Sequence, residues 1–409
     1  MGRDDAPLFA APSLNERCHC LNVEVGALRR EVERRLGESG APADLATTHP
    51  HLFSSTPVFV GAHDARRMTD VVRAVETAVA LPAYRDAVLA WAPGIARYDS
   101  GARGAFLGFD FHLSADGPKL IEINTNAGGG FLAAMLGDAA VACCGTSVPA
   151  RGGTPGYEQA VVTMLLAEWR HAGHSGSPRA IAIVDDAPTE QYLYPEFLLA
   201  QAALRRAGIE AVIAAPGGEP VDMVYNRLTD FALAAPGHAV LREAYLSGAS
   251  VVTPNPRAHA LYADKRALGL LCDESWLRAA GLGTRHAALL AQAVPRTAPA
   301  LARNAEQLWG GRKNLFFKPV AGYGSRGAYR GDKLTRKAFE VILAGGYVAQ
   351  ALVPPARRSV VQDGAPMKFD VRNYAYGGEV QLLAARLWQG QTTNFRSAGG
   401  GFAPVLVLP

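Results

Sequence analysis

Two short apolar stretches in the first third of the sequence each carry an isolated carboxylate. Asp110 lies at the centre of Gly108–His112, and Glu122 and Asn124 alternate with isoleucines. Side chains two residues apart on a strand point to the same face, so Glu122 and Asn124 share a face that Asp110 can join from a neighbouring strand. Such oxygen donors, completed by phosphate oxygens and water, suit Mg²⁺. The other interpretation is the wet face of a half-buried hairpin.

A lysine followed by several glycines forms the second group. Lys318 ends the apolar run that begins at Leu315. The turn after it contains Gly322, Gly324, Ser325 and Gly327. A charge beside flexible backbone N–H groups can hold phosphates, although the residue order is neither that of a P-loop nor G-x-G-x-x-G. A tight hairpin turn is the competing explanation.

Two further segments are compatible with a nucleotide but uninformative alone. Lys265 follows Asn255 and Pro256 and is expected on a helix, where most lysines are solvated. The apolar stretch 347–353, which contains Gln350, ends in a double proline. It is either an interdomain hinge whose backbone meets an adenine edge or an edge strand.

The last apolar stretches carry two arginines, Arg372 in Asp-Val-Arg and Arg386 in Ala-Arg-Leu. A charge flanked by apolar residues is rarely idle. Arg386, which apolar residues flank, is therefore either half of a structural ion pair or a clamp for a phosphate or carboxylate.

The middle of the chain predicts a small parallel α/β unit. Strands are expected at 180–184, 211–214 and 221–225, with helices at 192–207 and 238–247. Asp185-Asp186 and Asn226-Arg227 follow two of these strands, at the edge where such sheets place ligand groups. Arg227 could bind a substrate carboxylate or form a structural ion pair, and Asn126 lies beside the expected metal site.

Other elements must position these residues. The periodicity predicts a hairpin of strands 105–113 and 119–123, and a long helix over 64–92 that breaks near Pro82. Further helices are expected at 23–36, 131–141, 156–171, 258–271 and 335–343, and further strands at 315–318, 369–376 and 379–388.

Length and composition limit the class of protein. A chain of 409 residues that is 49% hydrophobic predicts two or three globular domains. Its 41 basic and 37 acidic residues leave a net charge of only +4, which gives no argument for nucleic acid. The sequence shows no signal peptide and no stretch long enough to span a bilayer, so we expect a cytoplasmic protein. Five cysteines, an odd number, argue against a disulfide framework.

Taken together, these motifs resemble the ATP-grasp superfamily, particularly its glutathione-synthetase-like carboxylate–amine ligases. The resemblance implies that Lys265 and Lys318 contact the nucleotide and that Gln350, Leu352 and Val353 form the adenine hinge. It further implies that the glycine turn closes over phosphates and that Arg386 contacts the reacting phosphoryl group. Asp110, Glu122 and Asn124 would hold two Mg²⁺ ions, and Asn126, Asn226, Arg227 and Arg372 would contact substrate.

The order of these motifs departs from the usual ATP-grasp order, because the metal segment precedes both lysines. The chain is in this respect similar to the circularly permuted, glutathionylspermidine-synthetase type, and Leu408 is expected near the 104–124 strands. The resemblance implies four parts. These are a mostly helical region of unknown role (1–94), the metal-binding part (95–175), a small α/β domain (178–252) and the nucleotide-binding part (253–409).

The implied activity is ATP- and Mg²⁺-dependent joining of a small-molecule carboxylate to an amine or thiol through an acyl phosphate. Two rivals are a small-molecule kinase of the same fold and a catalytically silent nucleotide-binding protein. The acid, the amine and the oligomeric state, including a homodimer, stay open.

Overall fold

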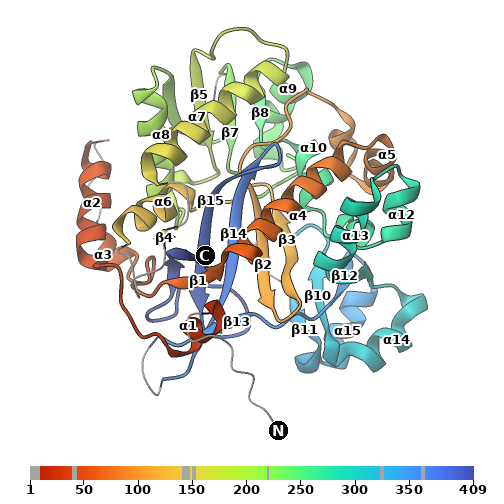
Figure 1. Ribbon diagram of the computed structural model, residues 1–409. Coiled ribbons are helices and arrows are strands. Elements are labelled where there is room, and N and C mark those ends of the chain that lie inside the picture. Colours follow the sequence, from red (N-terminus) through yellow and green to blue (C-terminus); the bar gives the residue numbers. More distant parts are fainter. Residues whose placement is uncertain are drawn as a thin grey trace.

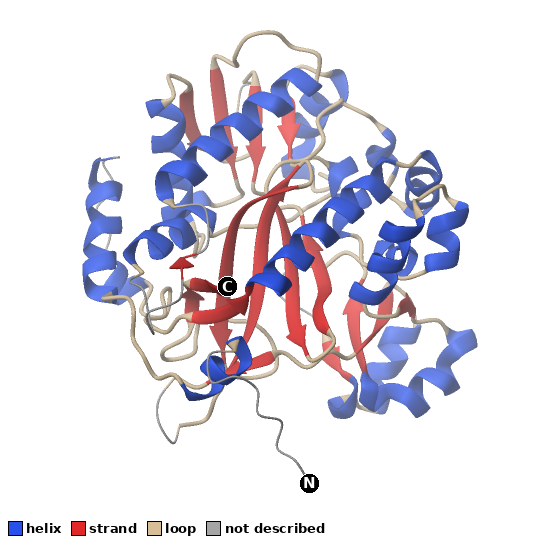
Figure 2. Ribbon diagram, viewed as in Figure 1, coloured by secondary structure: helices blue, strands red, loops and turns tan. Residues whose placement is uncertain are grey.

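The computed structural model describes residues 10–38, 44–140, 148–149, 153–218, 221–322, 327–360 and 364–409. Helices surround several β-sheets in a mixed α/β arrangement (Figures 1 and 2). The candidate residues concentrate on one of these sheets, which lies at the centre of the molecule (Figure 2).

The central sheet joins the two ends of the sequence. Its strands run in the order β16 (Gly401–Ala403), β15 (Glu379–Trp388), β14 (Met367–Tyr376), β2 (Leu107–Ser114) and β3 (Gly117–Asn124), with β13 (Ala356–Arg358) also paired to β14. All these pairs are antiparallel. Strands β2 and β3 form the expected hairpin, and β14 places the C-terminal residues directly beside it.

Alternation along these strands separates an apolar from a polar face. Phe109, Phe111 and Val371 are fully buried against α4 (Ala62–Ala80), which crosses the sheet in Figure 1. Asp110 and Arg372, their neighbours in sequence, lie directly opposite each other on the other face. Because successive strand residues point to opposite faces, one apolar surface for α4 entails one polar surface.

A second sheet carries Lys318 and Gln350. It has the order β11 (Tyr329–Arg330), β10 (Leu315–Pro319), β12 (Tyr347–Ala351) and β9 (Thr297–Pro299), and its pairs are antiparallel. Its core, which includes Phe317 and Ala349, packs against α14 (Ala305–Gly311) and α15 (Arg336–Leu343).

The predicted α/β unit is present as a parallel sheet in the order β6 (Glu210–Ala214), β5 (Ala180–Val184), β7 (Met223–Asn226) and β8 (Val251–Thr253). Its connecting helices are α8 (Tyr194–Arg206) and α9 (Ala239–Ser247). Strands β5 and β7 end at the residues that the sequence singled out, Asp185 and Arg227.

A small sheet pairs the C-terminal strand with two strands from the first half of the chain. Strand β17 (Val405–Leu408) pairs with β1 (Val58–Gly61) and with β4 (Val148–Pro149). Leu408 is paired with Gly61, whereas β14 is the strand that adjoins the hairpin. The sequence did not predict this sheet.

The remaining helices mostly follow the expected pattern. Pro82 starts α5 (Pro82–Trp91) directly after α4, which confirms the predicted break. The others are α1 (Ala11–Arg17), α2 (Val25–Glu38), α3 (Leu45–Thr48), α6 (Gly130–Ala139), α7 (Thr154–His171), α10 (Pro256–Ala258), α11 (Ala267–Leu271), α12 (Glu274–Ala279) and α13 (Thr284–Ala293). No helix in the described ranges is long and apolar enough to cross a membrane.

The prediction of one helix over 258–271 is wrong. The segment consists of α10, a π-helix (His259–Ala263) and α11, and Lys265 lies in the turn before α11. Asp264 has an extended backbone, and the Lys265 N–H donates to the Val320 carbonyl at 3.0 Å. This contact with the second sheet replaces a helical hydrogen bond and points Lys265 toward the central sheet.

Candidate functional site

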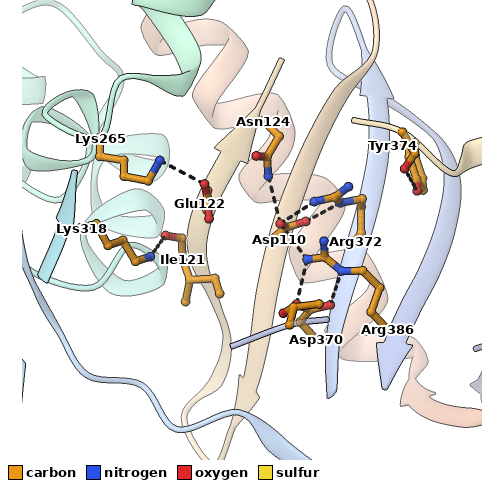
Figure 3. A network of polar contacts seen from close by, with 12 residues as sticks. Asp110, Ile121, Glu122, Asn124, Lys265, Lys318, Asp370, Arg372, Tyr374 and Arg386 are labelled. Atoms are coloured by element: carbon orange, nitrogen blue, oxygen red, sulfur yellow. Dashed lines mark hydrogen bonds and ion pairs between the residues drawn. The ribbon is translucent and has the colours of Figure 1, made fainter. Parts of the chain in front are cut away.

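Asp110 is the centre of an ionic network on the polar face of the central sheet (Figure 3). Its Oδ1 accepts from Arg372 Nε at 2.6 Å, and its Oδ2 accepts from Arg372 Nη2 at 2.8 Å and Arg386 Nη2 at 2.9 Å. Arg386 also donates to both oxygens of Asp370, at 2.9 and 2.8 Å. Asn124 Nδ2 adds a further bond to Asp110 Oδ2 at 3.0 Å.

The network fixes the charge of its members. Burial opposes ionisation of Asp110, but the guanidinium groups of Arg372 and Arg386 outweigh it and lower the pKa of this carboxyl group to about 2. Burial likewise opposes the charge of Arg386, yet Asp110 and Asp370 raise its pKa. Both arginines therefore stay cationic, and neither is free to move as a long surface side chain would be.

Glu122 lies beside two lysines that come from distant elements (Figure 3). Its Oε1 is 3.1 Å from Lys265 Nζ. Lys318 Nζ donates at 2.8 Å both to the Ile121 carbonyl and to Gln350 Oε1. The β2–β3 register shifts between Asp110 and Phe111, which makes room for one extra residue on β3. Ile121 and Glu122 consequently both line a cavity.

Burial and neighbouring charges shift the pKa values of Glu122 and Lys318. Burial opposes the charge of Glu122, but Lys265 and Lys318 outweigh it, so its pKa is lowered. Burial lowers the pKa of Lys318 to about 8, because the attraction of Glu122 compensates only in part and Lys265 adds repulsion. Lys318 is thus a cation that gains from an additional anionic partner.

A cavity of about 550 Å³ extends from this network between the central and second sheets. Its inner part is polar and is lined by Glu122, Lys318 and Arg386. Its outer part is lined by apolar side chains and the hinge, namely Phe316, Leu352, Val353, Pro354 and Trp388.

The hinge offers backbone groups to this cavity. The Val353 carbonyl accepts from His112 Nδ1 at 2.7 Å, while the Leu352 N–H is bonded to the Asn314 carbonyl at 2.8 Å. The Val353 N–H and the Leu352 carbonyl have no hydrogen bond to any described residue. These two groups belong to one trans peptide and point in opposite directions, so at most one of them can face a given ligand edge.

A second cavity, of about 320 Å³, adjoins the first. Five side chains line both: Glu122, Asn124, Arg372, Arg386 and Phe395. From this shared border the smaller cavity extends past Asn126 to the ends of β5 and β7, where it is lined by Asp185 and Arg227.

Arg227 is a buried cation in the smaller cavity, with only 8% of its surface exposed. Its Nη1 donates to the carbonyl and side-chain oxygens of Asn126 and to the Tyr225 hydroxyl. Its Nε has no hydrogen-bond partner, and no carboxylate of the described chain lies within ion-pair distance. Asp185 and the buried Glu196 attract Arg227 only from beyond ion-pair distance, so an anionic ligand here would add a direct ion pair.

Asp185 supplies a negative charge to the same cavity. Its Oδ1 accepts from the Asp186 N–H at 2.8 Å and from Gln191 Nε2 at 3.0 Å. Burial raises the pKa of this carboxyl group, and Arg227 offsets only part of that effect. The smaller cavity thus presents opposite charges at one end.

Some predicted residues lie elsewhere. Asn226 is buried but lines neither cavity; its side chain bonds to the Pro254 carbonyl at 3.2 Å and the Leu228 N–H at 3.0 Å. Gly324 and Ser325 fall outside the described residues. Of the glycine turn, Gly322 lines the smaller cavity and accepts from Lys265 Nζ at 3.0 Å, and Gly327 has a positive φ of 69°.

Asp370 and His112 line the larger cavity but were given no role by the sequence analysis, which noted Asp185 only at a strand end. Asp370 precedes Arg372 by two residues, and His112 follows Asp110 by two, so strand alternation already placed each on the polar face. Asp185 follows a predicted strand, which is the same signal that singled out Arg227.

Comparison with known proteins finds similar solved structures but no match by sequence. No protein-family model and no curated protein sequence matches the chain. A glutathione-synthetase-like effector from Globodera pallida superposes with a TM-score of 0.51 at 12% identity, over 93% of this chain and 97% of that one. The chain therefore shares the overall fold of this glutathione-synthetase-like effector.

Two other solved structures are similar to a smaller extent. A protein described as a putative gamma-glutamylcysteine synthetase from Methylobacillus flagellatus KT has 14% identity and a TM-score of 0.44, over 85% of this chain and 89% of that one. The ATP-grasp ligase PsnB in complex with a minimal precursor has 15% identity and a TM-score of 0.29, over 56% of this chain and 90% of that one.

Proposed function

We propose that this protein is an ATP- and Mg²⁺-dependent ligase that activates a small-molecule carboxylate as an acyl phosphate and transfers it to an amine. The observation that carries the proposal is the pair of adjoining cavities, which share Glu122, Asn124 and Arg386. One cavity has a flat apolar end beside a cationic end, and the other contains a buried arginine without a carboxylate partner.

The larger cavity suits a nucleoside triphosphate. Adenine would lie against the apolar side chains of the hinge, with its edge on one backbone group of the Leu352–Val353 peptide. The phosphates would then extend toward Lys318 and toward Lys265, which lines the adjoining smaller cavity. Because burial depresses the pKa of Lys318, a phosphate oxygen would stabilise its charged form.

The donor set for Mg²⁺ fits in part. Glu122 and Asn124 each offer an oxygen at the border of the two cavities. Both oxygens of Asp110 are already bonded to Arg372 and Arg386, so we assign Asp110 to orienting these arginines. No group of three or more His, Cys, Asp or Glu residues that could hold a metal occurs in the described chain. When bound to Glu122 and Asn124, Mg²⁺ would neutralise phosphate charge.

The smaller cavity suits the acid. Arg227 would pair with a carboxylate that does not react, and Asp185 with a cationic group beside it. The reacting carboxylate must lie at the other end, beside Arg386, so the acid carries a second anionic group. Of the four predicted substrate contacts, Asn126, Arg227 and Arg372 line this cavity, and Asn226 supports the strand end.

The reaction needs two transfers. A carboxylate oxygen of the acid attacks the γ-phosphorus of ATP, and the bond to the β,γ-bridging oxygen breaks to release ADP. The amine nitrogen then attacks the acyl carbon, inorganic phosphate leaves, and the amine loses its proton to solvent or phosphate. Arg386 stabilises the charge on the transferring group at the border, and Lys318 stabilises that on the nucleotide.

We further propose that the chain order is circularly permuted, since residues 95–175 supply the hairpin β2–β3 and residues 253–409 supply β14 beside it. A cytoplasmic location, a homodimeric state and the four predicted domain boundaries remain predictions.

Hydroxylamine tests the proposal without knowledge of the amine, because it traps acyl phosphates as hydroxamates. With ATP, Mg²⁺ and a panel of amino dicarboxylic acids and small peptides, we expect acid-dependent ADP release together with hydroxamate. A stable phosphorylated product without hydroxamate would select the kinase. ATP binding without ADP release across the panel would select the silent binding protein.

A further inference from the structure

The smaller cavity has a largely aromatic wall beside its charged end. The wall consists of Tyr192, Leu193, Phe231, Phe395 and Phe402. If the protein recognised only the charged ends of the acid, this apolar surface would have no contact with the substrate.

The rings of the wall contact one another at the rim. Tyr192 and Phe395 have ring centroids 5.6 Å apart, and Phe395 and Phe402 lie 4.8 Å apart. Tyr192 nevertheless keeps 38% of its surface exposed, which is high for a ring held in a cluster. Ring area exposed at a cavity is available to an apolar group of the ligand.

The N-terminal region holds this wall in place. His49 Nε2 lies 2.7 Å from the Tyr192 carbonyl, and the two rings are 4.6 Å apart. The Phe402 N–H donates to the Leu52 carbonyl at 2.9 Å, and the Ser54 N–H donates to the Phe402 carbonyl at 2.8 Å. Residues 49–54, which lie in the region without an assigned role, therefore fix two of the rings.

Two consecutive glycines pack closely against both Phe402 of the wall and the charged Arg227. Gly129 has φ of 91°, and a Cβ there would lie 2.0 Å from Phe402 Cζ. A Cβ on Gly128 would lie 2.9 Å from Arg227 Nη2. Any side chain at these positions would displace Phe402 or Arg227, so these glycines keep aromatic and cationic recognition in one cavity.

We propose that the aromatic wall selects an acid whose body, between its two anionic ends, carries an aromatic or bulky apolar group. The inference rests on the proposed ligase function for the placement of those ends. It gives residues 49–54 the role of positioning a specificity-determining surface. The wall would bury the apolar group against Tyr192 and Phe395 while Arg227 and Arg386 hold the ends.

Two probes with identical charged ends test the proposal. In γ-glutamyl-phenylalanine and γ-glutamyl-glycine, an α-amino acid head and a distant carboxylate flank a benzyl group or a hydrogen. Binding of each to the full-length protein is measured by calorimetry with Mg²⁺ and the β,γ-imido analogue of ATP. We expect the phenylalanine probe to bind more tightly by about tenfold or more. Equal affinity, preference for the glycine probe, or binding of neither would overturn the proposal.

Substitutions in the aromatic wall test which side chains produce the preference for the phenylalanine probe. Phe395→Ala should abolish this preference, Phe395→Leu should keep most of it, and Tyr192→Ala should weaken it. Because Tyr192 lines only the smaller cavity, Tyr192→Ala should leave the affinity for the ATP analogue unchanged. The matched control is Leu246→Ala, which removes a half-exposed apolar side chain that lines neither large cavity. If Phe395→Ala melts at a lower temperature than the control, the preference is judged from Tyr192→Ala instead. Unchanged preference in the decisive variant would overturn the proposal.

The same probes separate this inference from the ligase assignment. Preferential binding of the phenylalanine probe without hydroxamate formation from any acid would retain the wall and reject the ligase. Hydroxamate formation together with tighter binding of the glycine probe would retain the ligase and reject the wall.

Discussion

The two cavities differ in how their charges are balanced. On the central sheet, Asp110, Asp370 and Glu122 face Arg372, Arg386 and Lys265 at ion-pair distance. In the smaller cavity, Arg227 has hydrogen bonds to neutral oxygens but no carboxylate partner in the described chain. The carboxylates of the first arrangement are ion-paired within the protein, whereas Asp185 and Glu196 attract Arg227 only from longer range. We therefore propose positioning for the central network and substrate recognition for Arg227.

The largest expected effect comes from Glu122→Gln, which keeps the shape of the side chain but removes its charge. The variant should lower the rate of ADP release by at least about a hundredfold, because the metal and Lys265 both lose their carboxylate. ADP release and the melting temperature are measured together. Full activity in a folded variant would reject the metal assignment.

Asp110→Asn should destabilise the protein by about 3 kcal/mol, because two buried arginines lose their common partner. Denaturant unfolding measures the change. The folded-state pKa of about 2 lies below the ordinary 3.8, so the wild type has the full contribution above pH 4 and loses it as the pH falls toward 2. The variant should lack this acid-dependent component; a variant with the same acid profile as the wild type would contradict the assignment.

Arg227→Met should have the opposite effect on stability. Since the arginine is buried without an ion pair, its removal should leave the free energy of unfolding unchanged or raise it by about 1 kcal/mol. The KM for the acid should rise by about tenfold to a hundredfold, with the KM for ATP unchanged. The control is Arg278→Met, an exposed arginine on α12 that lines neither large cavity. A marked loss of stability would show that Arg227 is a structural residue.

The smallest expected effect is a pH dependence of ATP binding. Lys318 has a pKa of about 8 without ligand, so its charge is present below that pH and is lost above it. If the phosphates require the charged form, the Kd of ATP should rise by about tenfold per pH unit above pH 8 and be flat below it. Calorimetry at several pH values measures this. Lys318→Arg should abolish the dependence, and an unchanged profile in that variant would exclude Lys318 as its source.

Much of the central site was predictable because alternation on a strand is a local property. The spacing of Glu122 and Asn124, and of Asp370 and Arg372, placed each pair on one face whatever the rest of the fold. The sequence also indicated the parallel α/β unit and the break at Pro82. It did not indicate the turn at Lys265, because that turn depends on a bond to Val320, which follows strand β10 of another sheet.

The sequence by itself determined which side chains carry charge and which neighbours share a face. Only the tertiary structure decided that Arg372 meets Asp110, since 262 residues separate them and the register of β14 against β2 sets the pairing. It also decided that Asp110 is occupied by arginines while Glu122 and Asn124 border both cavities. Pairing across a sheet depends on the packing of the whole apolar face against α4, and local spacing does not contain that information.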